Sequence, residues 1–352
     1  MSKHRSAIEK KGLEIGSVVL AAGLLAAPAW SIGQTLLNGA GSTFAAPIYS
    51  NWVDAYRKIH ADIQITYHAI GSGGGIRQIM EGGVDFGASD APMTDKQMQD
   101  YKDAHGFKIL HFPTVIGADV PAYNLPGAPE VNFTPEILAG IYLGRITMWN
   151  DPMLQEANPK ANLPANRIMV LHRSDGSGTT YIWADYLSKV SEDWKNKAGK
   201  GTSINWPVGL SARGNDGVSE LIAKTPNSLG YVELSYAIQK RLAYGRVRNA
   251  SGNFIKADLA SVTAAAADAS QNLSDDFRFS ITNAAGKDAY PIASFSWLLV
   301  PAKIPDAGKR KAVVDFLSWA LADGQGLTQQ LMYARLPERV VSKELGAVSK
   351  IQ

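Results

Sequence analysis

Apolar residues along this chain follow a strand spacing in some segments and a helical spacing in others. Ile63, Ile65 and Tyr67 alternate with other positions, as in a strand, whereas apolar residues between Ile48 and Tyr56 recur at helical spacing. Similar units of strand, loop and helix follow one another through most of the sequence. This succession predicts an α/β fold with largely parallel sheets.

Two extended apolar runs interrupt the alternation. Residues 109–123 form the first, which Pro113 and Pro121 break, and residues 290–300 form the second. Neither run has a helical spacing. We interpret both as extended segments that cross between two domains.

The first 31 residues differ from the rest of the chain. Four Lys or Arg precede an apolar run over residues 15–30, and small residues at 27–31 offer a cleavage site, an arrangement typical of a secretory signal. An uncleaved membrane anchor is the alternative, but the run is shorter than the roughly 20 residues that a spanning helix needs. Cleavage would leave 321 residues (352 minus 31), more than the roughly 250 to 300 that one core supports. We therefore expect two domains.

The composition narrows the functional class. Cysteine is absent, which excludes disulfides, thiolate catalysis, Cys-ligated zinc and a lipid-anchored N-terminal Cys. An exported chain of this kind fits a bacterial periplasm. Removing residues 1–31, with four Lys or Arg and two Asp or Glu, takes the net charge from +3 to +1 (3 − 4 + 2). No long basic run remains, so we expect no nucleic-acid partner. The six histidines lack metal-ligand spacing, and we expect no metal or cofactor.

Candidate chemistry concentrates in residues 172–180, between an apolar run at 167–171, predicted as a strand, and a helical pattern. The Gly, Ser and Thr residues of this loop leave N–H groups free to bind an anion at a helix N-terminus. Arg173 adds a charged fork that suits phosphate or carboxylate oxygens. A strand-to-helix turn with a capping Ser or Thr explains the same loop equally well.

Three more loops combine Gly with hydroxyl or acidic residues at the end of a predicted strand: residues 41–44, 71–75 and 89–90. Ligands of open α/β sheets bind outside the carboxyl ends of the strands. The four loops are therefore predicted to converge on one site.

Enzyme motifs are incomplete in this sequence. The dinucleotide pattern G-x-G-x-x-G fails at Phe44 and at Ile76, no P-loop is present, and the nucleophile elbow G-x-S-x-G around Ser89 lacks its last Gly. His172 could act as a base, but a histidine in this position is more often packed or solvated. We expect a protein without catalytic activity. The alternative is a phosphoester hydrolase with Ser89 or Ser177 as nucleophile.

These loops resemble those of the phosphate-binding proteins of bacterial high-affinity phosphate ABC importers, the PstS family. The likeness covers about residues 38–340 and includes Trp149-Asn150-Asp151-Pro152, Gly230-Tyr231-Val232-Glu233 and Tyr290-Pro291-Ile292. The motifs that carry it are Gly39-Ala40-Gly41-Ser42-Thr43-Phe44, Gly71-Ser72-Gly73-Gly74, Asp85-Phe86-Gly87-Ala88-Ser89-Asp90-Ala91-Pro92 and Arg173-Ser174-Asp175-Gly176-Ser177-Gly178-Thr179.

The resemblance implies a two-lobed, type II-like periplasmic binding protein, each lobe a mostly parallel sheet flanked by helices. Lobe 1 would comprise residues 32–115 and 292–352, and lobe 2 residues 116–291. It also implies a monomer that closes on inorganic phosphate and delivers it to the permease and ATPase subunits of an inner-membrane ABC transporter. A related surface protein that retains the fold is a further alternative.

The resemblance also implies the ligand set. In this set, Asp175 would hold Arg173 in place without itself contacting the phosphate. Asp90 would accept the proton that phosphate carries near neutral pH, which sulfate lacks, whereas arsenate shares it; a site with a buried acceptor rejects an analogue without the matching donor. The implied phosphate ligands are Thr43, Phe44, Ser72, Asp90, Arg173, Ser177, Gly178 and Thr179.

Overall fold

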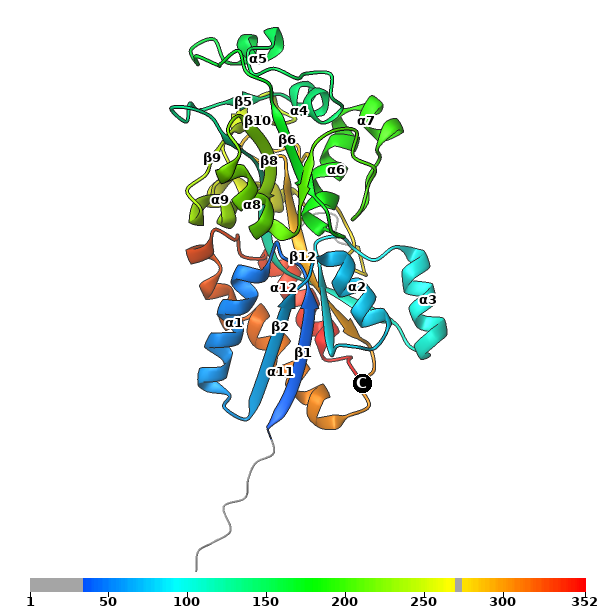
Figure 1. The fold of residues 1–352 in the computed structure, drawn as a ribbon. Helices are drawn as coiled ribbons and strands as arrows, with labels where there is room; N and C mark the ends of the chain where they lie inside the picture. The colour runs from blue at the N-terminus through cyan, green and yellow to red at the C-terminus, as the bar shows by residue number, and fades with distance from the viewer. Residues whose placement is uncertain (1–33, 270–273) are drawn as a thin grey trace, which may run out of the picture. The chain divides into compact units, whose positions relative to one another are not determined.

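Two long strands, β4 (Ile109–Asn124) and β12 (Ala293–Pro301), lie side by side and antiparallel in the middle of the main sheet (Figure 1). The structure is a computed structural model that describes residues 34–269 and 274–352, so the predicted signal sequence lies outside the described residues. β4 is buried along nearly its whole length, as expected for an apolar strand covered on both faces. Both predicted crossings are therefore strands.

The main sheet joins two groups of parallel strands through β4 and β12. Strands β1, β2 and β3 pair in parallel on the β12 side, and β6, β7 and β8 on the β4 side. The contacts of β12 with β3 and of β4 with β8 are antiparallel. Within the described residues the order is β2-β1-β3-β12-β4-β8-β6-β7, with β9 beside β4. These strands are β1 (Thr35–Gly41), β2 (Ile63–Ala69), β3 (Phe86–Ser89), β6 (Met169–Arg173), β7 (Leu210–Ala212), β8 (Ser228–Glu233) and β9 (Ala243–Tyr244).

The result is a two-lobed α/β fold in which each lobe is a mostly parallel sheet and two extended strands connect the lobes. A small second sheet, which the sequence patterns did not predict, has the order β11-β10-β5. Its strands are too short to show a period, and they are β5 (Asn132–Phe133), β10 (Arg246–Arg248) and β11 (Phe254–Ile255).

Helices flank the main sheet along both groups of strands (Figure 1). The helices of the strand-loop-helix units follow the loops that the sequence predicted, whereas the C-terminal helix α12 was not predicted. The helices are α1 (Ala46–Ile59), α2 (Ser72–Met80), α3 (Asp95–His105), α4 (Pro135–Tyr142), α5 (Pro152–Ala157), α6 (Gly178–Val190), α7 (Glu192–Lys197), α8 (Gly214–Lys224), α9 (Leu234–Gln239), α10 (Leu259–Ala269), α11 (Ala307–Leu321) and α12 (Glu338–Val348), with 3-10 turns at Asp323–Leu327 and Gln329–Leu331.

Side-chain caps set where several helices begin. Thr94 and Gln97 form a reciprocal capping box at the start of α3. Thr134 caps α4, whose first residue is a proline, which suits the first helical position because its missing N–H is not needed there. Asp306 accepts the N–H of Lys309, which sets the start of α11 at Ala307.

Strand β6 lies two residues further along the chain than the predicted strand at 167–171. Its partner explains the shift, because β6 pairs in parallel with β7 from Leu171 to Arg173. Likewise, β8 begins at Ser228 because β4 pairs with it from that residue. Arg173 therefore ends a strand of the sheet, which fixes its backbone more firmly than a loop would.

Each lobe has its own aromatic packing. In one lobe, the rings of Trp183 and Tyr231 are stacked with centroids 5.1 Å apart. In the other, Tyr56 meets Phe316 edge-on at 5.2 Å. Such pairs add specific geometry to the burial of large apolar surfaces.

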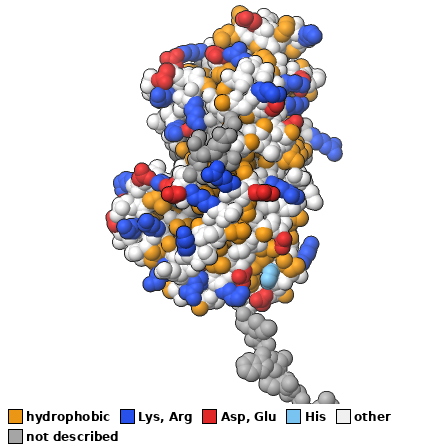
Figure 2. Space-filling view, turned by 180° about the vertical axis from the view of Figure 1, so that it is seen from behind, with side chains coloured by type: hydrophobic (Ala, Val, Ile, Leu, Met, Phe, Trp, Pro, Cys, Tyr) orange, Lys and Arg blue, Asp and Glu red, His pale blue; other side chains and the backbone are white. Residues whose placement is uncertain are grey.

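Charged side chains of both signs are spread among apolar ones on the face that Figure 2 shows. This face therefore lacks the continuous stripe of Lys and Arg that nucleic-acid-binding proteins present. Within the described residues, no helix combines the length and the apolar character that crossing a bilayer requires.

Candidate functional site

Asp90, directly after β3, is buried with three serine hydroxyls directed at its carboxylate. Ser42 and Ser296 donate to Oδ1 at 2.5 and 2.7 Å, and Ser72 donates to Oδ2 at 3.1 Å. A carboxylate offers about four lone-pair sites, so these bonds leave one site on Oδ2. Burial raises the pKa of Asp90, and it outweighs the bonds from the serines and the charge of Arg173, which lower the pKa. The three serines stabilise the carboxylate of Asp90, and its remaining lone pair on Oδ2 can accept one more hydrogen bond.

Ser296 reaches Asp90 because β12 runs antiparallel beside β3. Trp297 pairs with Ser89, so Ser296 lies opposite Asp90, the residue that follows β3. Sequence reasoning missed both Ser42, whose loop it predicted without giving this residue a role, and Ser296. The available signal for Ser296 was that Ser294 and Ser296 place hydroxyls inside an otherwise apolar strand.

Arg173 is held in one orientation by Asp175. Its Nε donates to Oδ1 at 2.8 Å and its Nη2 donates to Oδ2 at 2.6 Å, while Nη1 donates to Oγ1 of Thr179 at 3.1 Å. Burial raises the pKa of Asp175, but the hydrogen bonds and charge of Arg173 outweigh burial and lower it. This two-point pairing fixes the plane of the guanidinium.

The N-terminus of α6 supplies backbone donors. Ser177 caps this helix, because its Oγ accepts the N–H of Thr180 at 3.1 Å, and its own hydroxyl proton stays available. In the described part of the chain, the N–H groups of Gly178 and Thr179 have no acceptor, as expected for the first turn of a helix. Residues 172–180 can therefore form a capped turn and also bind an anion, so the two interpretations of this loop are compatible.

The loop between β1 and α1 supplies a second set of donors. Thr43 and Phe44 are buried there, and their carbonyls accept the hydroxyls of Tyr236 at 2.7 Å and Tyr333 at 2.6 Å. These bonds hold the peptide planes in place. Among the described residues, no acceptor faces the N–H groups of Thr43 and Phe44.

The residues of the two lobes are in direct contact at the site. A Cβ added to Gly178 would overlap Oδ2 of Asp90 and Oγ of Ser72, so only glycine allows this approach. The N–H of Gly73 also donates to the carbonyl of Gly176 at 2.9 Å. The structure thus brings the eight predicted ligand residues into one buried region. We call Thr43, Phe44, Ser72 and Asp90 the first wall, and Arg173, Ser177, Gly178 and Thr179 the second wall.

The two serines considered as nucleophiles of a hydrolase form hydrogen bonds with backbone groups instead. Oγ of Ser89 bonds to the carbonyl and the N–H of Ala91, and Ser177 caps α6. His172 stacks on Trp206 with centroids 4.8 Å apart, and burial lowers its pKa. In the described residues, no imidazole or carboxylate bonds to either serine, and no cluster of potential metal ligands is found. The geometry suits binding rather than hydrolysis.

Comparison with known proteins identifies the family. A family model described as the PBP superfamily domain matches residues 26–323. The phosphate-binding protein PstS of Xylella fastidiosa strain Temecula1 is 41% identical over 311 residues, which cover 87% of this chain and 83% of that protein. PstS of Pasteurella multocida is 40% identical over 309 residues, covering 87% and 88%. The chain belongs to the PstS family.

Solved structures show the same fold. A high-affinity periplasmic phosphate-binding protein, solved with phosphate bound, aligns with a TM-score of 0.71 at 22% identity, over 88% of this chain and 93% of that chain. A human phosphate-binding apolipoprotein aligns with a TM-score of 0.72 at 18% identity, over 87% and 92%. The PstS relatives bear the name of a binding protein rather than that of an enzyme. The fold of this PstS-family chain is thus that of a periplasmic binding protein.

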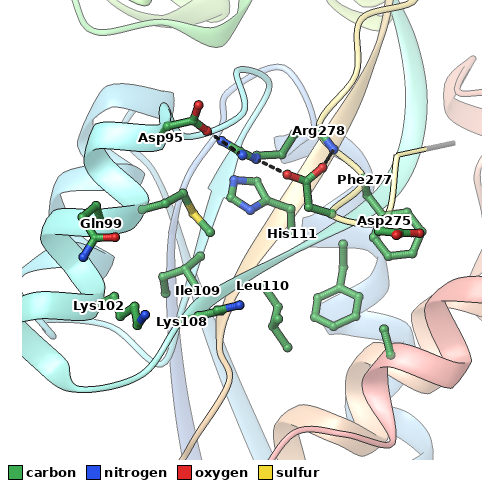
Figure 3. Close-up of a pocket in the computed structure, with 14 residues that line it drawn as sticks. Asp95, Gln99, Lys102, Lys108, Ile109, Leu110, His111, Asp275, Phe277 and Arg278 are labelled. Atoms are coloured by element: carbon green, nitrogen blue, oxygen red, sulfur yellow. Dashed lines mark hydrogen bonds and ion pairs between the residues drawn. The ribbon is translucent and has the colours of Figure 1, made fainter.

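A cavity of about 600 Å³ lies elsewhere in this PstS-family protein, between α3, the start of β4 and residues 275–278 (Figure 3). Arg278 at this cavity donates to Asp95 at 2.7 Å, to Asp276 at 2.8 Å and to the carbonyl of Met93 at 2.7 Å. The predicted ligand residues are not among those that line it. These contacts connect α3 to the segment that precedes β12.

Glu233, at the end of β8, should make the stability of the protein depend on pH. It is buried, and burial raises its pKa to about 8, although bonds from Ser235 and Tyr333 lower it. A carboxyl group with a raised pKa in the folded state stabilises the fold fully below its unfolded value of about 4.5. That contribution declines as the pH rises and is lost once the pH passes about 8.

Glu233→Gln mimics the protonated acid, so its melting temperature should rise relative to that of the wild-type protein as the pH increases from 5 to 8. Thermal unfolding at several pH values measures this difference. The matched control is Glu81→Gln, since Glu81 is exposed. A difference between Glu233→Gln and the wild type that stays constant with pH would contradict the prediction.

Proposed function

We propose that this PstS-family protein binds inorganic phosphate between its lobes and delivers it to an ABC importer. The observation that carries the proposal is the one acceptor site left on Asp90, which faces a wall of donors. Phosphate near neutral pH keeps a proton that Asp90 can accept, and its other oxygens can accept hydrogen bonds from the N–H and hydroxyl donors of the site. Sulfate has no such proton, so its oxygen would oppose the carboxylate of Asp90. The names of the relatives, phosphate-binding proteins, support the same ligand.

In this proposal the second wall binds the unprotonated oxygens. Arg173 would contribute its guanidinium, Ser177 and Thr179 their hydroxyls, and Gly178 and Thr179 their N–H groups. These are mostly uncharged donors, and the charge of Arg173 is balanced by Asp175. A site of this kind would release phosphate when the lobes separate more readily than a cluster of free Lys and Arg would.

The first wall would complete the shell with the hydroxyl and N–H of Thr43, the N–H of Phe44 and the hydroxyl of Ser72. Ser72 at present donates to Asp90 and accepts the N–H of Asp90 at 3.0 Å. Binding phosphate through Ser72 would therefore require its proton to turn from Asp90 to the ligand. This exchange would leave a second lone pair of Asp90 available near the phosphate.

The organisation of the protein follows from the same proposal. Lobe 1 would comprise residues 32–115 and 292–352 and lobe 2 residues 116–291, and β4 and β12 would flex as the lobes open. Residues 1–31 would direct export to the periplasm and then be removed. The mature protein would act as a monomer, and it would dock on the permease subunits, which work with the ATPase subunits of the importer.

Calorimetric titration of the purified protein with phosphate and with sulfate tests the function. Phosphate should bind roughly a thousandfold or more tightly than sulfate, because a buried acceptor without its donor is costly. Arsenate, which also carries a proton, should compete with phosphate. Equal affinities for phosphate and sulfate would contradict the proposal, and hydrolysis of a chromogenic phosphoester would favour the hydrolase.

A further inference from the structure

Asn215 contacts a predicted ligand threonine from each wall, although it is not itself among the predicted ligands. It lies in the first turn of α8 and is fully buried. Its Nδ2 donates to Oγ1 of Thr43 at 3.0 Å and to Oγ1 of Thr179 at 2.9 Å.

The orientation of the Asn215 amide is determined by its third contact. The backbone N–H of Glu233 lies 3.0 Å from Oδ1 of Asn215. A backbone N–H can only donate, so the atom that faces it must be the amide oxygen. The NH₂ group therefore faces the two threonines, and both of its protons are used.

The polarity of the threonine hydroxyls follows from these donors. Oγ1 of Thr179 accepts from Asn215 and from Nη1 of Arg173, so both of its lone pairs are occupied. Its proton can then only be donated. Oγ1 of Thr43 also accepts from Asn215. In the part of the chain that the structure describes, neither hydroxyl donates to another residue.

We propose that Asn215 is a positioning residue that fixes the hydroxyls of Thr43 and Thr179 as donors to the bound oxyanion. This inference rests on the proposed function. Two donor hydroxyls bind unprotonated oxygens, so the one protonated oxygen of the ligand is left to face Asp90. Asn215 would thus determine how a protonated oxyanion is oriented without contacting it.

The start of α8 is itself tied to the arginine pair. The N–H of Gly214 donates to Oδ1 of Asp175 at 3.0 Å, and Gly214 has a φ of +72°, which glycine adopts without strain. The carboxylate that orients Arg173 therefore also places Asn215. The carboxylate of Asp175 thus positions both donors to Oγ1 of Thr179, which are Nη1 of Arg173 and Nδ2 of Asn215.

Phosphate titration of Asn215→Ala and Asn215→Asp tests the inference. Asn158→Ala is the matched control, because Asn158 is also buried, donates through Nδ2 to two backbone carbonyls and accepts a backbone N–H through Oδ1, at the end of α5. Melting temperatures of all three variants show how far each change affects folding alone.

Asn215→Ala should weaken phosphate binding roughly tenfold at both pH 6 and pH 8, the loss expected for about one net hydrogen bond. Asn215→Asp accepts the threonine protons instead of supplying donors. It should weaken binding roughly a hundredfold at pH 8, and less at pH 6, where the second proton of phosphate can be accepted. Loosened packing would instead lower the affinity of both variants equally at both pH values.

The control separates the two proposals. Asn158→Ala should lower the melting temperature but bind phosphate like the wild-type protein. Asn215 variants that bind like Asn158→Ala would overturn the role of Asn215 and leave the proposed function intact. A wild-type protein that does not bind phosphate would overturn the proposed function itself.

Discussion

Arg173→Ala should lower the phosphate affinity about a hundredfold or more, because truncating one member of a buried, hydrogen-bonded charge pair costs several kcal/mol. The side chain of Arg173 is 1% exposed, and that of Asp175 is 13% exposed. Removing the guanidinium deletes a charged donor to phosphate, and it also leaves Asp175 as an unpaired negative charge near the anion. Calorimetric titration of the variant with phosphate measures the loss.

Two further variants sharpen the test of Arg173. Arg173→Lys keeps the charge but not the planar fork, so its affinity should fall between those of the wild-type protein and Arg173→Ala. Arg145→Ala removes the same charge from an exposed pair with Asp193, and it should bind phosphate normally. If Arg173→Ala bound phosphate as tightly as the wild type, residues 172–180 would not form the ligand site.

Asp90→Asn should lower the preference for phosphate over sulfate, by roughly ten- to a hundredfold, the worth of a hydrogen bond to a charged group. The amide oxygen of the variant can still accept from Ser42 and Ser296. Its NH₂ group would then replace Oδ2 and donate towards the ligand. An unprotonated sulfate oxygen would meet a donor there, whereas the proton of phosphate would lose its acceptor.

Asp119→Asn is the control for this prediction. Asp119 is fully buried opposite Glu233 in the pairing of β4 with β8, and its carboxylate has no hydrogen-bond partner in the described residues. Burial raises its pKa well above the ordinary value, so the amide resembles its protonated form. Titration with both anions should show an unchanged preference in Asp119→Asn. Unchanged selectivity in Asp90→Asn would remove the proton-acceptor argument.

Much of the site could be predicted because its loops are short, local units. Strand, loop and helix follow one another around residues 41–44, 71–75 and 172–180, and the carboxyl ends of parallel strands meet at one edge of a sheet. Gly, Ser and Thr in these positions already indicate free backbone donors. The α/β fold was predicted from periods that extend over only a few residues, and the two crossings were predicted from two extended apolar runs.

The residues that orient the site could not be predicted in this way. Ser296 and Asp90 lie 206 positions apart, and Asn215 and Thr43 lie 172 positions apart. Their contacts depend on the register of β12 against β3 and on where α8 begins. A single buried serine or asparagine carries no periodic signal. Ser296 stood out only as a hydroxyl inside an otherwise apolar strand, and that did not indicate which residue it would contact.

The sequence by itself determined the alternation of strands and helices around the site, the loops that carry donors, and the acid and the arginine at the ends of two strands. These features follow from local periodicity and from the conformations that Gly, Ser and Thr allow. The tertiary structure alone decided where β6 ends, and it decided which hydroxyls stabilise Asp90 and which amide orients the threonines. Such choices depend on strand register and on long-range packing, because a hydrogen bond forms only between groups that the whole fold brings within about 3 Å.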